Sequence, residues 1–312
     1  MDRSHLMTAL VTLRREIHTR AELAGQETDT GQIIRNFIEP HQPDELVTGL
    51  GDIGLAAVVE GSEDGPTVVF RAELDAVPVD EDNGVDHRSC RSGVSHACGH
   101  DGHMAIVAGL AANLHRRPPR RGRVVLLFQP AEETGAGALS VLEDERFDSI
   151  APDWIFALHN LPGEEFGEIQ IKSGPFAAGS VGTVLGFRGT TSHAAYPEQG
   201  RSPATAVAQL IQDLAGLPDS MEAGDGIAQL TVIHARIGEA AFGTTPGDAE
   251  VMATLRSDRE EILERLRVGV VDLSQEIART YGLGLTHSWT DQFPVTVNNP
   301  EAVAMVEDVA ES

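Results

Sequence analysis

The chain has 312 residues, 41% of them hydrophobic, and its 48 acidic and 23 basic residues give a net charge of −25. This length suits two domains, and the apolar content excludes a globally disordered chain. The negative charge argues against nucleic-acid binding, which needs clustered positive charge to meet phosphates. We hypothesise that the acidic surface is an adaptation to high salt, where screening lets like charges coexist.

The sequence also favours a particular compartment. The N-terminal residues contain no long apolar segment of the kind that secretory signals carry, and no run reaches the ~18 consecutive apolar residues of a membrane span. The two cysteines, Cys90 and Cys98, are too few for a disulfide framework. We therefore predict a protein of the reducing cytoplasm that does not bind membranes.

The first half of the chain predicts an α/β domain. Residues 6–38 are expected to form two helices that are separated near Ala24 and Gly25. Three apolar runs are typical of buried strands in a sheet with parallel pairing. They cover residues 67–75, 124–128 and 155–158, and residues 104–115 have the periodicity of a helix.

Polar residues stand where each of these three strands is expected to end. The first run ends at Asp75, the second is followed by Glu132 and Glu133, and the third by His159 and Asn160. In open α/β sheets, ligands bind outside the carboxyl ends of the strands. We expect these groups to meet at one edge of the sheet.

Residues 96–103 read His-Ala-Cys-Gly-His-Asp-Gly-His, a loop that offers a thiolate at Cys98 and several imidazoles. Gly99 and Gly102 let the backbone bend so that neighbouring side chains converge. Sulfur, imidazole nitrogen and carboxylate oxygen are the atoms that bind Zn²⁺ and related ions. The paired Glu132 and Glu133 offer one carboxylate for a metal and one for proton transfer. The pattern predicts a metal-dependent hydrolase.

The second half of the chain predicts a small α+β domain. Strands are expected over 181–188, 227–237, 249–256 and 283–290, and helices over 203–217 and 259–281. That βαββαβ order is the ferredoxin-like pattern. We predict an inserted domain at residues 180–292, within a catalytic domain formed by residues 1–179 and continued by residues 293–312.

Five segments in order carry a resemblance to a known family: residues 71–78, 96–103, 128–133, 158–160 and 192–197. They resemble the motifs of the binuclear-metal amidohydrolase/peptidase family. It includes hippurate hydrolase, N-acyl-amino-acid deacetylases, N-acetyldiaminopimelate deacetylase and plant auxin-conjugate hydrolases. Five motifs with compatible spacing are far more specific than one. The resemblance implies a phosphorylase/hydrolase-like mixed-sheet catalytic domain with an inserted ferredoxin-like domain that acts as a lid and forms a homodimer.

The resemblance also implies residue roles. It assigns two divalent ions, Zn²⁺ or Mn²⁺, to the ligands Cys98, His100, Glu133 and His159. Glu132 would be the general base, Asp75 an acid that orients ligands, and His193 a residue of the lid that stabilises the oxyanion. The implied reaction is hydrolysis of the amide bond of N-acyl amino acids or small peptides by metal-activated water.

Alternatives stay open for single residues and for the whole chain. Alone, Cys98 could be a small buried apolar residue, His159 a core histidine, and His193 part of an ordinary turn. We interpret His96 and His103 as supporting or helix-start residues. The family usually continues beyond Ser312 and supplies one more histidine ligand. We therefore expect the chain to lack that segment, and the alternative is a catalytically impaired relative that acts only as a weak metal-binding or dimerisation module.

Overall fold

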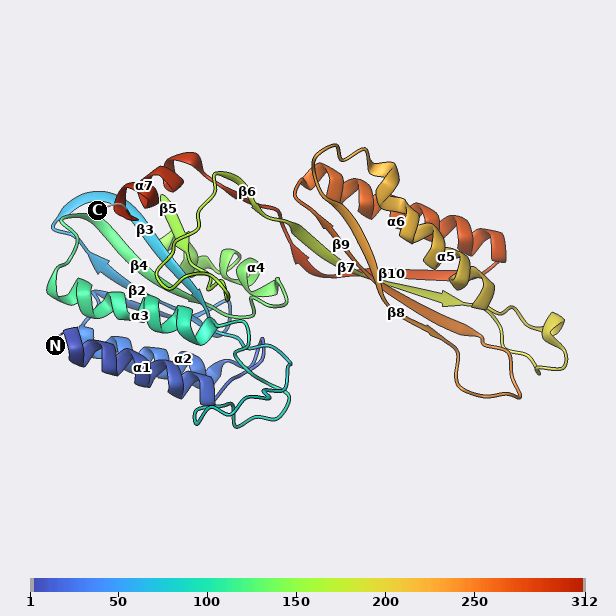
Figure 1. The fold of residues 1–312 in the computed structure, drawn as a ribbon, viewed down its shortest axis with the longest axis horizontal. Coiled ribbons are helices and arrows are strands. Elements are labelled where there is room, and N and C mark those ends of the chain that lie inside the picture. Colours follow the sequence, from blue (N-terminus) through green and yellow to red (C-terminus); the bar gives the residue numbers. More distant parts are fainter. Residues whose placement is uncertain (1–2, 311–312) are drawn as a thin grey trace. The chain divides into compact units, whose positions relative to one another are not determined.

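The computed structural model describes residues 3–310 (Figure 1). They form two units, with the boundary between Glu168 and Ile169, and each unit is described by itself. None of the helices among residues 3–310 is long and apolar enough to cross a membrane. The division predicted from the sequence, in which residues 293–312 return to the catalytic domain, stays a prediction.

The first unit contains a five-stranded mixed sheet in the order β1-β2-β4-β3-β5. β3 runs parallel to both β4 and β5, whereas β2 is antiparallel to β1 and to β4. The mixed α/β fold predicted from the sequence is therefore confirmed. The strands are β1 (Glu45–Leu50), β2 (Gly54–Glu60), β3 (Glu63–Glu73), β4 (Arg121–Gln129) and β5 (Trp154–Ala157).

Helices lie on both faces of this sheet. On one face, α1, α2 and α3 pack over an apolar core that includes Ile17, Ile34, Met104, Leu126 and Phe128 (Figure 1). On the other face, the short α4 contributes Val141 to a smaller core. The helices are α1 (Arg3–Thr19), α2 (Thr28–Ile38), α3 (His100–Arg116) and α4 (Ala136–Leu142).

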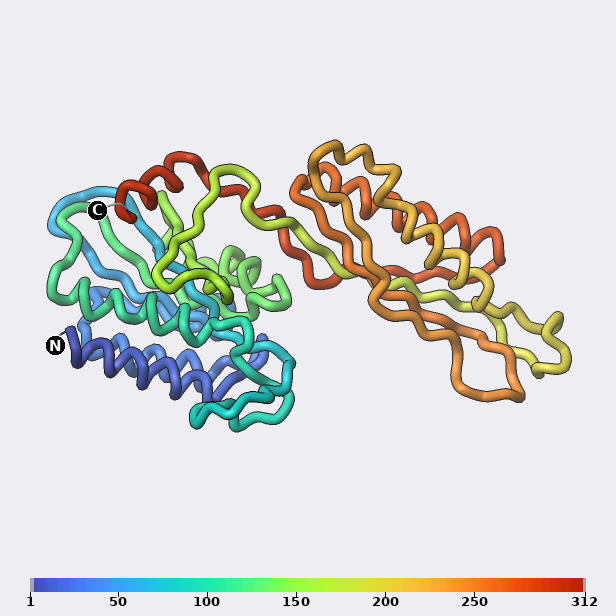
Figure 2. The backbone as a smooth tube through the Cα atoms, in the orientation of Figure 1, coloured from blue at the N-terminus to red at the C-terminus, as the bar shows by residue number. Residues whose placement is uncertain are grey.

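Two features of the first unit differ from the sequence-based expectation. The apolar run at 155–158 was expected to be a buried strand, but β5 lies at the edge of the sheet and Ile155 is 52% exposed. The side chains of β5 alternate between partly buried and exposed, because successive side chains of a strand point to opposite faces of the sheet. α3 begins at His100, earlier than the expected residue 104, so His100 and His103 both belong to the helix. Between β3 and α3 the chain runs as a long loop (Figure 2).

The second unit contains a four-stranded antiparallel sheet in the order β10-β7-β9-β8. α5 and α6 cover one face of it and bury an apolar core that includes Leu210, Leu255 and Leu266 (Figure 1). The observed element order is the βαββαβ order predicted from the sequence. These elements are β7 (Gly179–Arg188), α5 (Ala204–Gly216), β8 (Ala228–Ile237), β9 (Asp248–Ser257), α6 (Glu260–Tyr281) and β10 (Gly284–Phe293).

Three short elements complete the second unit. β6 (Gly174–Ala177) and β11 (Thr296–Asn298) form a two-stranded antiparallel ribbon. α7 (Pro300–Ala310) follows the ribbon.

Candidate metal centre

The ends of three parallel strands bring the predicted site residues together. β3 is followed by Asp75, β4 by Glu132 and Glu133, and β5 by His159. Parallel strands place their carboxyl ends at the same edge of a sheet. α3 begins at this edge with His100. Segments that are far apart in the sequence thus meet as their strand pattern predicts.

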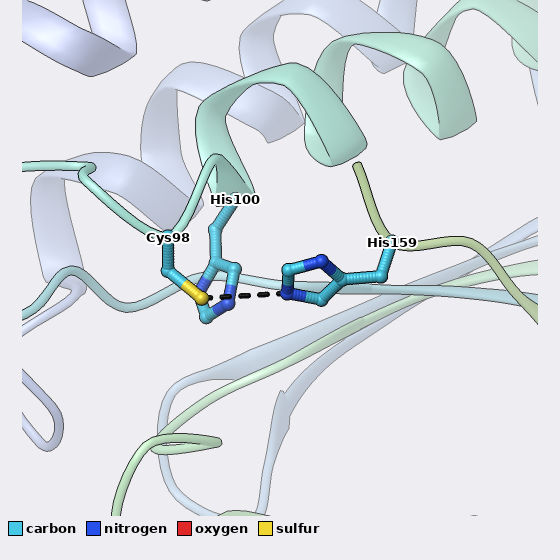
Figure 3. A group of neighbouring side chains, drawn as sticks. All are labelled: Cys98, His100 and His159. Carbon is cyan, nitrogen blue, oxygen red and sulfur yellow. Dashed lines mark hydrogen bonds between the residues drawn. The ribbon is translucent and has the colours of Figure 1, made fainter. Parts of the chain in front are cut away.

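Three groups of metal-compatible side chains contain His100, and two of them, which we call the donor groups, offer free ligand atoms. In the first, ligand atoms of Cys98, His100 and His159 all lie within 4.8 Å of one another. Cys98 Sγ lies 3.3 Å from His159 Nε2, and Figure 3 shows the two side chains facing each other. In the second group, His100 Nε2 lies 3.6 Å from Glu133 Oε1 and 3.9 Å from Glu132 Oε2. His100 therefore stands between a sulfur-containing group and a carboxylate-containing group.

The backbone fixes the orientation of the two imidazoles. His100 Nδ1 lies 2.9 Å from the carbonyl oxygen of Asp75, and His159 Nδ1 lies 2.8 Å from that of Asn160. A carbonyl oxygen can only accept, so each Nδ1 carries the proton and donates it. Each Nε2 is then directed into the site. This use of the second ring nitrogen is how metal-binding histidines are held.

The residues present fit a divalent cation. His100 Nε2 and Glu133 Oε1 are both buried and have no hydrogen-bond partner. Buried polar atoms are almost always satisfied, so two unsatisfied atoms 3.6 Å apart call for a missing partner. A nitrogen, a sulfur and carboxylate oxygens are a donor set that suits Zn²⁺.

The electrostatics of His100 point the same way. Burial would lower the pKa of His100. The neighbouring side chains of Asp75 and Cys98, with the charge of Glu73, outweigh burial and raise that pKa to about 11. The surroundings thus favour positive charge at this ring, and a divalent ion can take the place of the proton.

The pKa values of Glu132 and Cys98 are shifted as well. Burial raises the pKa of Glu132 and outweighs the opposing charges of Arg71 and His100. A carboxylate with a raised pKa is a better proton acceptor near neutral pH. The neighbouring imidazole of His100 lowers the pKa of the Cys98 thiol, but burial and Glu133 raise it by more. Cys98 would therefore release its proton when a metal binds.

Asp75 is fully buried and forms hydrogen bonds with both His100 and Glu133. Its carbonyl accepts from His100, and its Oδ2 accepts the backbone N–H of Glu133 at 2.9 Å. Its Oδ1 has no hydrogen-bond partner. The structure thus places Asp75 behind His100 and Glu133, where it can orient them.

A third group of metal-compatible residues, formed by Glu73, His100 and His103, has its atoms engaged with one another. Glu73 Oε2 accepts from His103 Nδ1 at 2.8 Å, and its Oε1 pairs with Arg71. Burial would raise the pKa of Glu73, but the bonds from His103 and Arg71 lower it to about 2. This buried, ionised carboxylate supports the site rather than offering a free ligand atom.

His193 lies in the second unit and is exposed. The backbone N–H of Ala195 donates to its Nδ1 at 3.1 Å. Nδ1 is therefore unprotonated, and in the neutral ring Nε2 carries a proton that it can donate.

Two supporting residues were not predicted from the sequence. Arg71 Nε donates to Gln129 Oε1, which ties the ends of β3 and β4 together. Glu27 is fully buried, and its Oε1 accepts the backbone N–H of Ala131. Ala131 has φ of 49°, a left-handed conformation directly before Glu132. Arg71 lies in a motif that could have drawn attention to it, whereas nothing in the sequence around Glu27 marks it.

The chain is similar to a known family, to several known proteins and to solved structures. The model of a family described as peptidase family M20/M25/M40 matches residues 69–312. N-acetylcysteine deacetylase of Bacillus subtilis is 31% identical over 293 residues, which cover 94% of this chain and 76% of that protein. N-acetyldiaminopimelate deacetylase of Anoxybacillus flavithermus is 35% identical over 204 residues, which cover 65% of this chain and 54% of that protein. The structure of Bacillus subtilis YXEP, described as a dinuclear metal binding peptidase, has a TM-score of 0.79 at 28% identity, covering 99% of this chain and 80% of YXEP.

Proposed function

This chain belongs to peptidase family M20/M25/M40 and is a hydrolase of amide bonds, and we propose that it removes the acyl group from N-acyl amino acids or cleaves small peptides. The observation that carries the proposal is the convergence of two donor groups on His100. The named relatives act on N-acetylcysteine and N-acetyldiaminopimelate, which supports a substrate with an acylated amino group.

The chemistry divides among a few residues. Two divalent ions would be held by Cys98, His100, Glu133 and His159, and the YXEP structure, described as dinuclear, supports that number. Such ions supply an acidified water and a polarised substrate carbonyl. Glu132 takes the proton of the attacking water and passes it to the leaving amine. The thiolate of Cys98 favours Zn²⁺ over Mn²⁺.

The second unit has a proposed role as lid and dimerisation domain, inserted into the phosphorylase/hydrolase-like catalytic domain. His193 would donate a hydrogen bond from its Nε2–H to the tetrahedral oxyanion when the lid closes, and the protonation pattern of its ring supports this role. β8 is an edge strand with exposed Ile233 and Ile237, which supports a homodimer formed through this unit. Both cysteines are unpaired, which supports a cytoplasmic location.

The experiment combines metal analysis with a substrate screen. Purified protein is stripped with a chelator, reloaded with Zn²⁺ or Mn²⁺, and assayed with N-acetyl and N-benzoyl amino acids. We expect about two ions per chain and hydrolysis that depends on added metal. At most one ion without turnover would support the alternative of an impaired, weakly metal-binding relative.

Glu132→Gln tests the general base, because it keeps the shape of the side chain and removes the proton acceptor. We expect the turnover to fall by about 10²- to 10⁴-fold with metal content unchanged. Glu276→Gln is the matched control, since Glu276 is an exposed residue of α6 in the second unit. A Glu132→Gln variant as active as the wild type would exclude Glu132 as the base.

A further inference from the structure

His159 needs an anchor outside its own strand. It is exposed, it follows the short edge strand β5, and the residues after it up to Gln170 are exposed too. Little apolar packing is therefore available to hold its ring opposite Cys98. Its neighbour Asn160, by contrast, makes several contacts with α3.

A chain of hydrogen bonds runs from β3 through α3 to Asn160. Glu73 at the end of β3 accepts from His103 Nδ1 at 2.8 Å. His103 Nε2 lies 2.7 Å from Asn160 Oδ1 and 2.9 Å from the backbone nitrogen of Asn160. A protonated Nε2 donates to Oδ1, and an unprotonated Nε2 accepts the backbone N–H. His103 thus keeps a bond to Asn160 in either protonation state.

The chain is shielded from water where it begins. His103 is 1% exposed and Glu73 is 2% exposed. Breaking a bond between such groups leaves a buried polar atom without a partner, which costs about 1–3 kcal/mol. The ring of His103 also packs edge-on against that of His159, with centroids 4.7 Å apart.

Gly99 supplies an independent observation. It precedes His100 and has φ of 91°. A Cβ on Gly99 would lie 2.2 Å from Asn160 Oδ1, so a side chain at this position would displace Asn160. The Asn160 side chain therefore packs directly against the backbone of Gly99, in a space that we call its seat. This seat lies beside His100, the residue that both donor groups share.

We propose that Asn160, held by His103 and Glu73 and seated on Gly99, is the positioning residue that fixes His159 opposite Cys98. The proposal rests on the proposed function, in which His159 is a metal ligand. Asn160 acts through His159, and no role in binding substrate is assigned to it.

The first test measures zinc affinity by competition with a chromogenic chelator. We expect Asn160→Ala to weaken the binding of one of the two ions by about 10- to 100-fold, as is typical of residues that support a ligand. In activity assays, kcat should fall at limiting zinc and recover as zinc is raised, while KM stays unchanged. Asn113→Ala is the matched control. Asn113 is exposed on α3, and its Oδ1 accepts a hydrogen bond from Arg116.

Gly99→Ala tests the seat without changing Asn160. It should weaken zinc binding as Asn160→Ala does. Gly93→Ala is its matched control, because Gly93 also has a positive φ of 74° but open space around it. An effect of Gly99→Ala beyond that of Gly93→Ala then reports the clash with Asn160 rather than backbone strain.

A metal-free readout separates this proposal from the proposed function. Amide hydrogen exchange of residues 158–161 in chelator-treated protein should speed up in Asn160→Ala and Gly99→Ala and stay unchanged in both controls. Unchanged exchange, or faster exchange with unchanged zinc affinity, would overturn the positioning role. If the wild type binds no metal, the proposed function fails, and the exchange data alone decide whether Asn160 docks the His159 segment.

Discussion

The two units bury different kinds of side chain. In the second unit, the described buried polar residues are hydroxyl residues, namely Ser180, Thr183, Ser257 and Ser274, and they lie around an apolar core. The first unit buries carboxylates and imidazoles, namely His18, Glu22, Glu27, Glu73, Asp75, His96, His100, Asp101 and His103. Burial of ionisable groups is unfavourable unless they are paired. The number of buried ionisable groups in the first unit therefore points to a functional requirement in addition to stability.

Pairing is uneven within the first unit. Asp101 accepts from both Arg14 and His18, and Glu73 accepts from His103. By contrast, His100 Nε2 and both ring nitrogens of His96 are buried without a partner. These unpaired atoms belong to the segment of residues 96–103, which contains the proposed ligands Cys98 and His100. The comparison indicates that the first unit gives up stability at its site, whereas the second unit is held by apolar packing.

The largest expected effect comes from His100→Ala, because this residue belongs to both donor groups. We expect the metal content to fall well below two ions per chain, and metal affinity to fall by more than the 10- to 100-fold typical of supporting residues. Metal analysis after dialysis, with activity at saturating metal, measures both. Cys98→Ala removes a member of one group and should retain more metal than His100→Ala.

His234→Ala is the control for this experiment. His234 is an exposed residue of β8 in the second unit, so its loss should change neither metal content nor activity. Equal metal loss from the His100 and His234 variants would contradict the assignment of the metal site to the first unit.

The next effect is a response of the first unit to acid. Burial lowers the pKa of His96 to about 4, from 6.5 in the unfolded chain. Between these values the unfolded state binds the proton better, so stability falls as the pH drops through this window. Bonds lower the pKa of Glu73 to about 2 despite burial, so its contribution is lost in the same direction below about pH 5. Glu132, with a raised pKa, opposes them in part.

In metal-free protein, we expect the first unit to lose on the order of 2 kcal/mol between pH 6 and pH 4. His100, with a pKa of about 11, is protonated in both states below pH 6 and hardly contributes. The second unit should change less, because its described residues include no buried carboxylate or imidazole.

The chain's two tryptophans make this measurable, since Trp154 lies in the first unit and Trp289 in the second. Urea unfolding of Trp289→Phe follows the first unit, and that of Trp154→Phe follows the second. Adding His96→Leu should remove most of the pH response of the first unit. A response that survives His96→Leu in full would contradict the assignment to His96.

The contrast between the units also explains what the sequence could predict. In α6, the apolar residues Ile262, Leu266, Val270 and Ile277 recur at helical spacing and are buried, so local pattern and tertiary packing agree. The ends of β3 and β4 were predictable from local pattern too, because the apolar run of β3 ends in charged residues and that of β4 is followed by Gln129 and Pro130.

The parts that were missed depend on contacts between distant segments. The network of Glu73, His103 and Asn160 joins three elements, and single residues of these types are common on surfaces. The β1–β2 hairpin was not predicted, and the position of β5 at the edge of the sheet made it more exposed than its apolar run indicated. Strand order is decided by pairing between distant segments, which a local pattern does not contain.

The smallest effect concerns two buried threonines, one in each unit. Thr183 is 1% exposed and its Oγ1 has no hydrogen-bond partner, whereas Thr30 is fully buried and donates to Glu22 at 2.8 Å. Valine has nearly the same shape, so Thr183→Val should stabilise the second unit by about 1 kcal/mol, while Thr30→Val should destabilise the first by a similar amount. Trp289 lies directly opposite Thr183 on β10, and its fluorescence in urea follows the second unit. If both substitutions changed the free energy of unfolding in the same direction, the hydrogen bonding of buried hydroxyl groups would not be what distinguishes the two units.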